Sequence, residues 1–323
     1  MTVPSALSET PRTGWRSPQA GLLLVVLFWG ANFTALKLAF TQIEPLGLTA
    51  LRFVLGTAVM AGLVYRIEGS LSVPRSAVGP LVLLGLLGNT LYQLVFVEGL
   101  FRTSATNSSL ILAAMPVAVT LFAGLLGVER VSRRQVGAVL LAFLGVVIVL
   151  AARGMEGVAL GAKLGDLLMM LAVVLWTAYT LLMRRFPLQG ISSLKITTWT
   201  LFTGTPGLVL VGIPSLLRTD WSQVTWAGWG GVLYSSLLSL VAAYLLFNRG
   251  VRALGASGAA VYTCLTPLVA AGIAIVALGE RPTLVHFVGG GMIVAGVLLS
   301  RKPARTAAPA DDPVGAAEVH AAD

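Results

Sequence analysis

Apolar residues fill the chain in long runs from residue 20 to residue 300, and short polar joints separate these runs. Each run is about twenty residues long, and a helix of that length crosses a hydrocarbon layer of roughly 30 Å. The pattern predicts ten membrane-spanning helices, at residues 20–40, 46–65, 78–99, 104–127, 134–151, 165–185, 192–213, 226–247, 254–278 and 283–300.

The composition supports this prediction. Of 323 residues, 56% are hydrophobic and 11% are charged, and the mean hydropathy is +0.88. Ordinary soluble domains carry about 25% charged residues. A soluble fold of this length would have too few charges to keep so much apolar surface in water. The sequence therefore predicts an all-α integral membrane protein embedded in a lipid bilayer.

Basic residues are distributed unevenly between the two sides of the predicted membrane domain. With the N-terminus inside, fourteen Lys and Arg residues fall in inner segments and five in outer loops. Because Lys and Arg are retained on the cytoplasmic side, both termini are predicted to be cytoplasmic, in a multi-pass protein of the cell (inner) membrane. The same rule explains the net charge of +9, so we expect no nucleic-acid partner. Polar tails are predicted at 1–19 and 302–323, the second of them disordered.

Several kinds of chemistry lack the residues they would need. Cys264 is the only cysteine, so the chain can form no internal disulfide and no cysteine-based metal site. His286 and His320 are the only histidines, and there is no H-E-x-x-H motif and no Walker A sequence. We therefore predict no enzyme activity, no metal and no cofactor, and no direct use of ATP.

The two halves of the chain repeat one another. The stretch FWGANFTALK matches LWTAYTLLMR, which places Trp29 over Trp176 at an offset of 147 residues. Further along the offset becomes 151, and Pro116 matches Pro267. We predict repeats at 20–151 and 165–301, joined by a linker at 152–164. Five spans is an odd number, so the second repeat must enter the membrane from the opposite side. Inverted repeats of this kind place a binding site near the midplane and allow alternating access.

The tryptophan stretch with Lys37, and the blocks at 99–150 and 249–300, resemble the EamA family of the drug/metabolite transporter (DMT) superfamily. The resemblance covers roughly residues 20 to 301. It implies ten helices in two inverted five-helix repeats around a central cavity, lined mainly by the first, third, fourth, sixth, eighth and ninth spans. It also implies an inner-membrane metabolite transporter, often an exporter of amino acids, without fixing the substrate. The second repeat departs from the pattern, because Thr177 and Tyr179 replace the Gly and Asn that follow Trp29.

Polar and aromatic residues within the first span are the first candidates for the substrate site. Trp29 and Trp176 fall near the midplane, where they could form walls of a cavity or simply pack the junction of the repeats. Asn32 could contact a substrate or hydrogen-bond an adjacent helix. Lys37 would cost at least about 2.5 kcal/mol at mid-depth without water or a partner. It could extend to the interface, or pair with Glu98 as a gate, or bind a substrate carboxylate.

Other spans carry more polar groups than packing requires. The further substrate-binding candidates are Tyr92, Gln93, Asn107, Tyr179, Tyr244, Tyr262 and Thr266. Pro116 and Pro267 lie near the middle of their spans and are predicted to kink them, as hinges or as packing features. We interpret Arg52 as structural, bonded to backbone carbonyls or to a neighbouring helix. We interpret Glu129 and Glu280 as helix-end residues.

These features favour a secondary transporter that exports amino acids or related compounds by alternating access. Import or exchange of another small solute and multidrug export remain alternatives, and a membrane-embedded enzyme is the least favoured. Proton coupling needs a carboxylate on the pathway, for which Glu98 is the main candidate and Asp166 the weaker one; facilitated export needs neither. Glycines at 289–296, with Gly137 and Gly145, provide surfaces for close helix approach. The protein is expected to be a monomer or a homodimer.

Overall fold

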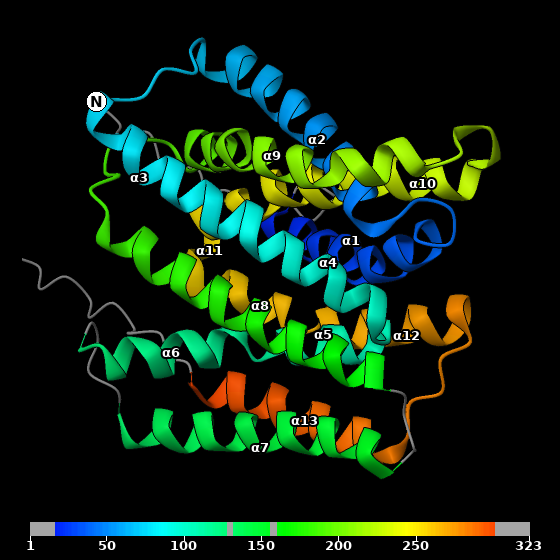
Figure 1. Ribbon diagram of the computed structural model, residues 1–323. Helices are drawn as coiled ribbons and strands as arrows, with labels where there is room; N and C mark the ends of the chain where they lie inside the picture. Colours follow the sequence, from blue (N-terminus) through cyan, green and yellow to red (C-terminus); the bar gives the residue numbers. More distant parts are fainter. Residues whose placement is uncertain (1–16, 128–131, 156–159, 301–323) are drawn as a thin grey trace, which may run out of the picture.

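The computed structural model describes residues 17–127, 132–155 and 160–300, and within these ranges every regular element is a helix (Figure 1). The predicted tails lie outside the described residues except for 17–19, where a helix begins at Pro18. Glu129 and residues 156–159 of the predicted linker also lie outside them.

Helices of the first half follow the predicted spans closely. They are α1 (Pro18–Ala39), α2 (Pro45–Glu68), α3 (Arg75–Gly85), the π-helical η1 (Leu86–Leu91), α4 (Tyr92–Arg102), α5 (Ala105–Ala113), α6 (Met115–Leu125) and α7 (Arg133–Met155). Local sequence explains several of the ends. Ser17 caps α1 by accepting the N–H of Ala20, proline occupies the first turn of α1 and α2, and Gly69 ends α2 at a φ of 71°.

The second half repeats this order. Its helices are α8 (Leu160–Arg185), α9 (Ser193–Arg218), the short η2 (Trp221–Gln223), α10 (Trp226–Leu233), the π-helical η3 (Tyr234–Ala242), α11 (Ala243–Thr263), α12 (Thr266–Leu278) and α13 (Leu284–Ser300). Eight helical segments among the described residues are long and apolar enough to cross a membrane, and two shorter apolar helices follow at Thr266–Leu278 and Leu284–Leu299. The prediction of an all-α membrane protein is confirmed.

The boundary predicted between the eighth and ninth spans is wrong, because α11 continues through it to Thr263. In the first repeat the chain breaks at Thr103, whose backbone is extended, and Ser104 then caps α5 by accepting the N–H of Asn107. The equivalent positions of the second repeat are Leu254 and Gly255. Neither has a hydroxyl that could cap a new helix, so the helix continues.

The two repeats are inverted relative to one another. Helix α7 packs along α13 with Gly145 against Gly289 and Gly296 against Ala138, so these equivalent helices run antiparallel. Helix α2 packs antiparallel on α9 in the same way. Thr57 and Thr205, which occupy equivalent positions in the two repeats, hydrogen-bond each other at 2.8 Å. Equivalent helices can run antiparallel only if the second repeat is turned over, which confirms the predicted inversion.

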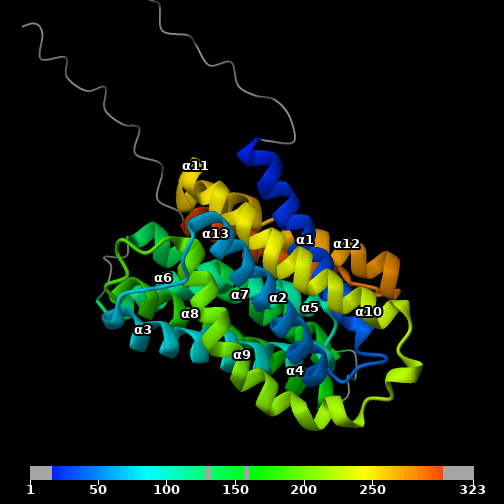
Figure 2. The ribbon, with the colours of Figure 1, turned by 90° about the horizontal axis from the view of Figure 1, so that it is seen from above.

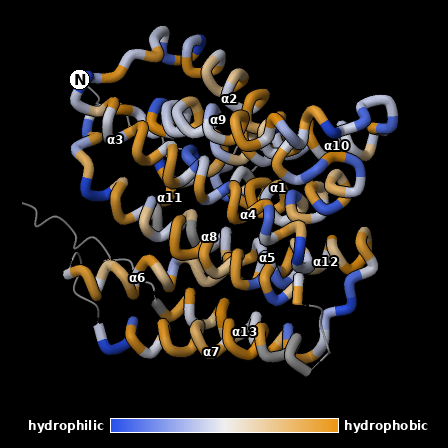
Figure 3. Tube along the Cα trace, in the orientation of Figure 1, coloured by the Kyte–Doolittle hydropathy of each residue, from blue (hydrophilic) through white to orange (hydrophobic). Residues whose placement is uncertain are grey.

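The α7–α13 pair lies along one side of the molecule and the α2–α9 pair along the opposite side, with α1 and α8 between them (Figure 1). Seen from above, α11 and α12 lie on one side and α3 and α9 on the other (Figure 2). Helix α1 packs on α11 and α12, and α8 packs on α4, α5 and α6. Apolar residues cover the helices along most of their length, and hydrophilic residues collect at helix ends and in loops (Figure 3). Large side chains such as Leu210 and Phe143 point outward, as expected for a surface in contact with lipid.

Candidate functional site

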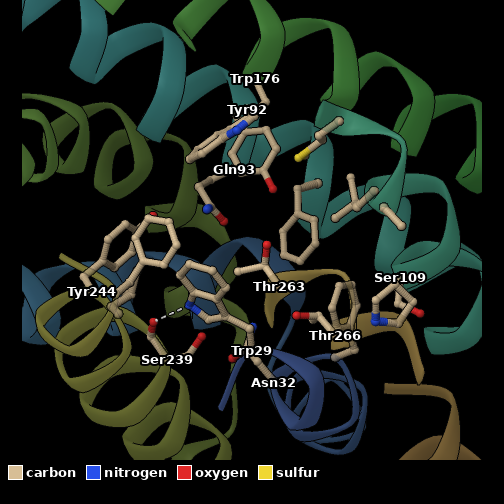
Figure 4. Close-up of a pocket in the computed structure, with 18 of the residues that line it drawn as sticks. Trp29, Asn32, Tyr92, Gln93, Ser109, Trp176, Ser239, Tyr244, Thr263 and Thr266 are labelled. Atoms are coloured by element: carbon tan, nitrogen blue, oxygen red, sulfur yellow. Dashed lines mark hydrogen bonds between the residues drawn. The ribbon is translucent and has the colours of Figure 1, made fainter. Parts of the chain in front are cut away.

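A cavity of about 350 Å³ lies at the centre of the molecule, between the two repeats (Figure 4). Its lining comes from α1, α4, α5, α6, α8, η3, α11 and α12, so all six spans named by the family resemblance contribute. Helix α2 also contributes, through Arg52. The volume falls in the range of small-molecule pockets, roughly 300 to 1,000 Å³.

Most of the residues chosen from the sequence meet at this cavity. Those that line it are Trp29, Asn32, Tyr92, Gln93, Trp176, Tyr244 and Thr266, together with Pro116 and Pro267. Five others do not line it, namely Lys37, Glu98, Asn107, Tyr179 and Tyr262. Contact with substrate remains a prediction for every one of these residues.

Aromatic rings from α1 and α11 form one wall of the cavity. The ring of Trp29 lies 5.9 Å from that of Tyr244 in an edge arrangement and 5.3 Å from that of Phe247. Its indole N–H donates to the carbonyl oxygen of Ser239 at 3.1 Å. The ring of Trp29 is therefore held in place both by packing and by a hydrogen bond to η3.

A second aromatic wall comes from α4 and α8. The rings of Tyr92 and Trp176 are 5.0 Å apart, and Phe96 stacks on Tyr92 at 5.8 Å. Tyr179 lies behind Trp176 at 5.0 Å without reaching the cavity. Figure 4 shows Tyr92 and Trp176 on one side of the cavity and Trp29 and Tyr244 on the other. The arrangement can hold a flat or apolar body between two walls.

The two π-helical segments were not predicted. Leu86–Leu91 and Tyr234–Ala242 occupy equivalent places in the third and eighth spans. A π-turn interrupts the regular helical hydrogen bonds and is frequent at functional sites. Here η3 presents the Ser239 carbonyl to Trp29, and η1 brings Gly88 so close to Tyr179 that a Cβ atom there would lie 2.4 Å from the ring.

Pro116 and Pro267 do interrupt their spans, as predicted. Each stands in the first turn of a new helix, α6 or α12, directly after a break in the span. The first turn of a helix suits proline, because backbone N–H groups there have no partner within the helix and proline, which has no N–H, costs no hydrogen bond. Their role as hinges remains a prediction.

Arg52 is the functional candidate that sequence reasoning undervalued. Its side chain is 2% exposed, and its Nη2 donates to Oε1 of Gln93 in α4 at 2.5 Å. The predicted bond to a neighbouring helix is thus confirmed. However, Arg52 also lines the cavity, and among the described lining residues it is the only one with a formal charge. The signal was present in the sequence, because a cation within an apolar span is rare and is usually functional.

The ion pair between Lys37 and Glu98, one of the alternatives considered for Lys37, is not among the contacts of the described residues. Lys37 Nζ donates to the carbonyl oxygen of Phe101 at 3.2 Å, and Glu98 pairs with Arg102 one turn along α4. An i,i+4 partner on the same helix is nearer than a residue on another helix, so Arg102 is the one that engages Glu98.

Several contacts join the two repeats at the end of the molecule where Lys37 and Glu98 lie. Thr103 Oγ1 donates to Oδ1 of Asp166, which is buried. In the loop after α1, Glu44 accepts from Arg218 at 2.7 Å. The hydrogen bond from Arg218 lowers the pKa of the Glu44 carboxyl.

Glu280 is a helix-end residue, as predicted, although it caps a helix of the other repeat. Its two carboxylate oxygens accept the backbone N–H groups of Ala105 at 2.7 Å and of Thr106 at 3.0 Å. These are free donors at the N-terminus of α5, where a negative charge is also favoured by the helix dipole.

We expect Glu280→Gln to destabilise the purified protein by about 1 kcal/mol, because the neutral amide satisfies one of the two N–H groups instead of both. The measurement is the midpoint of thermal unfolding in detergent. Glu98→Gln is the matched control, since it removes a carboxylate from a partly exposed i,i+4 pair worth about 0.3–0.5 kcal/mol. Equal shifts for the two variants would contradict the capping role.

Two inverted repeats that enclose a central cavity define a multi-pass membrane transporter. The chain belongs to the EamA-like transporter family, whose sequence pattern matches residues 18–151 and again residues 163–301.

Known proteins resemble this chain over most of their length. It is 29% identical to the uncharacterized transporter YyaM of Bacillus subtilis, over 86% of this chain and 91% of that protein. It is 25% identical to a probable terminal-alkyne amino-acid exporter of Streptantibioticus cattleyicolor, again over 86% and 91%. A solved crystal structure matches with a TM-score of 0.62 and 20% identity, over 88% of this chain and 96% of that one, and supports the fold.

Proposed function

We propose that this protein is a secondary transporter that exports amino acids or related small metabolites across the cell (inner) membrane by alternating access. The observation that carries the proposal is the central cavity, which both repeats line and whose two aromatic walls come from different pairs of helices. Relative movement of the two repeats would open such a cavity to one side and then to the other.

The chemistry of the lining favours a small organic solute with polar groups. Aromatic faces lie beside the polar side chains of Asn32, Gln93 and Thr266. A lipophilic cation, as carried by many multidrug exporters, would need a carboxylate, and none of the described lining residues has one. One relative carries the name of a probable amino-acid exporter, which supports the same class of substrate.

The distribution of Lys and Arg supports an orientation with both termini in the cytoplasm. Glu280, Asp166 and Glu98 would then lie toward the outer face. If transport is coupled to protons, Glu98 and Asp166 are the carboxylates available for it. Asp166 is the more buried of the two and bonds across the repeats.

Export from whole cells tests the proposal. Cells that overproduce the protein are loaded with a panel of amino acids, dipeptides and toxic analogues, and efflux is compared with that of cells carrying the empty vector. We expect faster efflux of one chemical class. If folded protein in the membrane moves none of the panel, and purified protein in liposomes also takes up none, the proposal is wrong.

A further inference from the structure

The guanidinium of Arg52 is a buried charge without a counter-charge. One of its N–H groups reaches Gln93 Oε1, and its carbon lies 5.1 Å from the centre of the Phe53 ring. Its Nε has no hydrogen-bond partner in the part of the chain that the structure describes. A guanidinium has five N–H donors and cannot lose its charge in a protein. A buried guanidinium with no counter-charge and an unsatisfied N–H group raises the free energy of the folded protein.

Carboxylates elsewhere in the described residues do not supply this counter-charge. Each of them is bonded at another place: Glu44 to Arg218, Glu68 to Lys195, Glu98 to Arg102, Asp166 to Thr103, Asp220 to Ser222 and Glu280 to the first turn of α5. None of them lines the cavity. The electrostatic neighbours of Arg52 are the neutral phenols of Tyr92 and Tyr244.

The fold itself does not need a cation at this position, as the second repeat shows. Gly56 and Thr57 of α2 correspond to Gly204 and Thr205 of α9, which makes Thr200 the equivalent of Arg52. Thr200 is also 2% exposed, and its hydroxyl donates to the carbonyl oxygen of Thr197 in its own helix. A neutral residue therefore suffices in the same architecture.

Two pairs of aromatic residues in the site keep the symmetry that Arg52 breaks. Trp29 and Trp176 occupy equivalent positions in the two repeats and line opposite walls of the cavity. Phe96 and Phe247 do the same. The equivalent of Gln93, which holds Arg52, is Tyr244. The aromatic walls thus occur in both repeats, whereas the charge and its amide partner occur in the first repeat alone.

We propose that Arg52 forms an anion subsite of the cavity and that the transported solute is an organic monocarboxylate, zwitterionic or anionic, whose carboxylate pairs with this guanidinium. The inference rests on the proposed transport function and names the chemical group of the solute that the site recognises. A single carboxylate balances the single positive charge. A phosphate dianion would bring a second negative charge for which the described lining has no cation. The body of the solute lies between the aromatic walls, and its remaining polar groups can reach the unpartnered oxygens of Asn32 and Thr266.

Binding to the purified full-length protein tests this subsite. The probes are matched in shape: 3-phenylpropionate, L-phenylalanine and L-phenylalaninamide, with a corresponding aliphatic set of 4-methylpentanoate, L-leucine and L-leucinamide. Affinity is measured from the rise in unfolding temperature with probe concentration. We expect carboxylates of at least one set to bind, and their amide to bind at least about tenfold more weakly, because a charge-assisted hydrogen bond is lost.

Variants of Arg52 separate an anion subsite from a structural role. Arg52→Gln keeps a donor for Gln93 and removes the charge, so we expect it to reduce carboxylate affinity about tenfold to a hundredfold. Without probe it should unfold at the same temperature as the wild type or higher, because an uncompensated buried charge has gone. Arg52→Lys should retain part of the affinity. A large fall in the unfolding temperature of Arg52→Gln, with an unchanged response to carboxylates, would overturn the proposal.

Transport by the same variants distinguishes this inference from the function on which it rests. If the wild type exports a solute that has no carboxylate, and Arg52→Gln exports it equally well, the anion subsite is wrong and the transport function stands. If the wild type moves no solute of any class, the transport function is wrong and the inference is overturned with it.

Discussion

Trp29→Ala is expected to lower the initial rate of solute efflux by about tenfold or more. The ring forms one wall of the cavity and contacts Tyr244 and Phe247, so its removal enlarges the cavity and frees both neighbours. Aromatic contacts are worth about 0.5–1.5 kcal/mol each beyond the area they bury, and a loss of 1.4 kcal/mol is a factor of ten. The rate is measured in whole cells and divided by the amount of folded protein in the membrane.

Two further variants test whether this loss of efflux comes from the cavity wall that Trp29 forms. Trp29→Phe keeps one aromatic ring and loses the second ring of the indole and the hydrogen bond to the Ser239 carbonyl, which is worth about 1 kcal/mol, so we expect it to keep a substantial part of the rate. Trp226→Ala is the matched tryptophan control, because Trp226 is 88% exposed and lies outside the cavity. Efflux by Trp29→Ala at the wild-type rate, or an equal loss in Trp226→Ala, would contradict the role of the wall.

The architecture could be predicted from the sequence because the bilayer itself restricts it. A membrane-spanning helix must be apolar over about twenty residues, so the positions of α1, α2 and α9 follow from composition, although α9 continues to Arg218, beyond the predicted end at 213. The inversion followed from counting five spans in a repeat that Trp29 and Trp176 had revealed. The continuous α11 was missed because a break in a helix depends on a capping residue, which the first repeat has in Ser104 and the second lacks.

The site was predicted in part, and its missing pieces depend on packing between distant segments. The π-helical turn at η3 places the Ser239 carbonyl against Trp29, which is 210 residues away in the sequence. No local pattern encodes such a contact. Arg52 could be recognised as unusual, but the face of α2 that it occupies depends on how that helix packs on α9 and α4. The contact of Lys37 could not be predicted for the same reason, since the carbonyl of Phe101 is a partner that side-chain patterns do not reveal.

Gly145→Leu is expected to have the largest effect on stability, lowering the free energy of unfolding by about 2 kcal/mol or more. A Cβ atom at Gly145 would lie 2.6 Å from the carbonyl oxygen of Gly289 and 2.9 Å from Ile293, so α7 and α13 would have to move apart along an extensive contact. Overpacking of this kind typically costs about 1–3 kcal/mol, and backbone atoms cannot move aside as a flexible side chain can. The measurement is unfolding by SDS in mixed micelles, or by heat with size-exclusion analysis.

Gly137→Leu in the same helix is the matched control for that experiment. Nothing lies within 4 Å of a Cβ atom at Gly137, and leucine favours a helix by up to about 1 kcal/mol relative to glycine, so this variant should be as stable as the wild type or more stable. Neither glycine lines the cavity. The fraction of Gly145→Leu that does fold should therefore bind probes with wild-type affinity, which separates damage to the α7–α13 pair from damage to the site. Equal stability of the two variants would show that the close approach of these helices is not what holds them together.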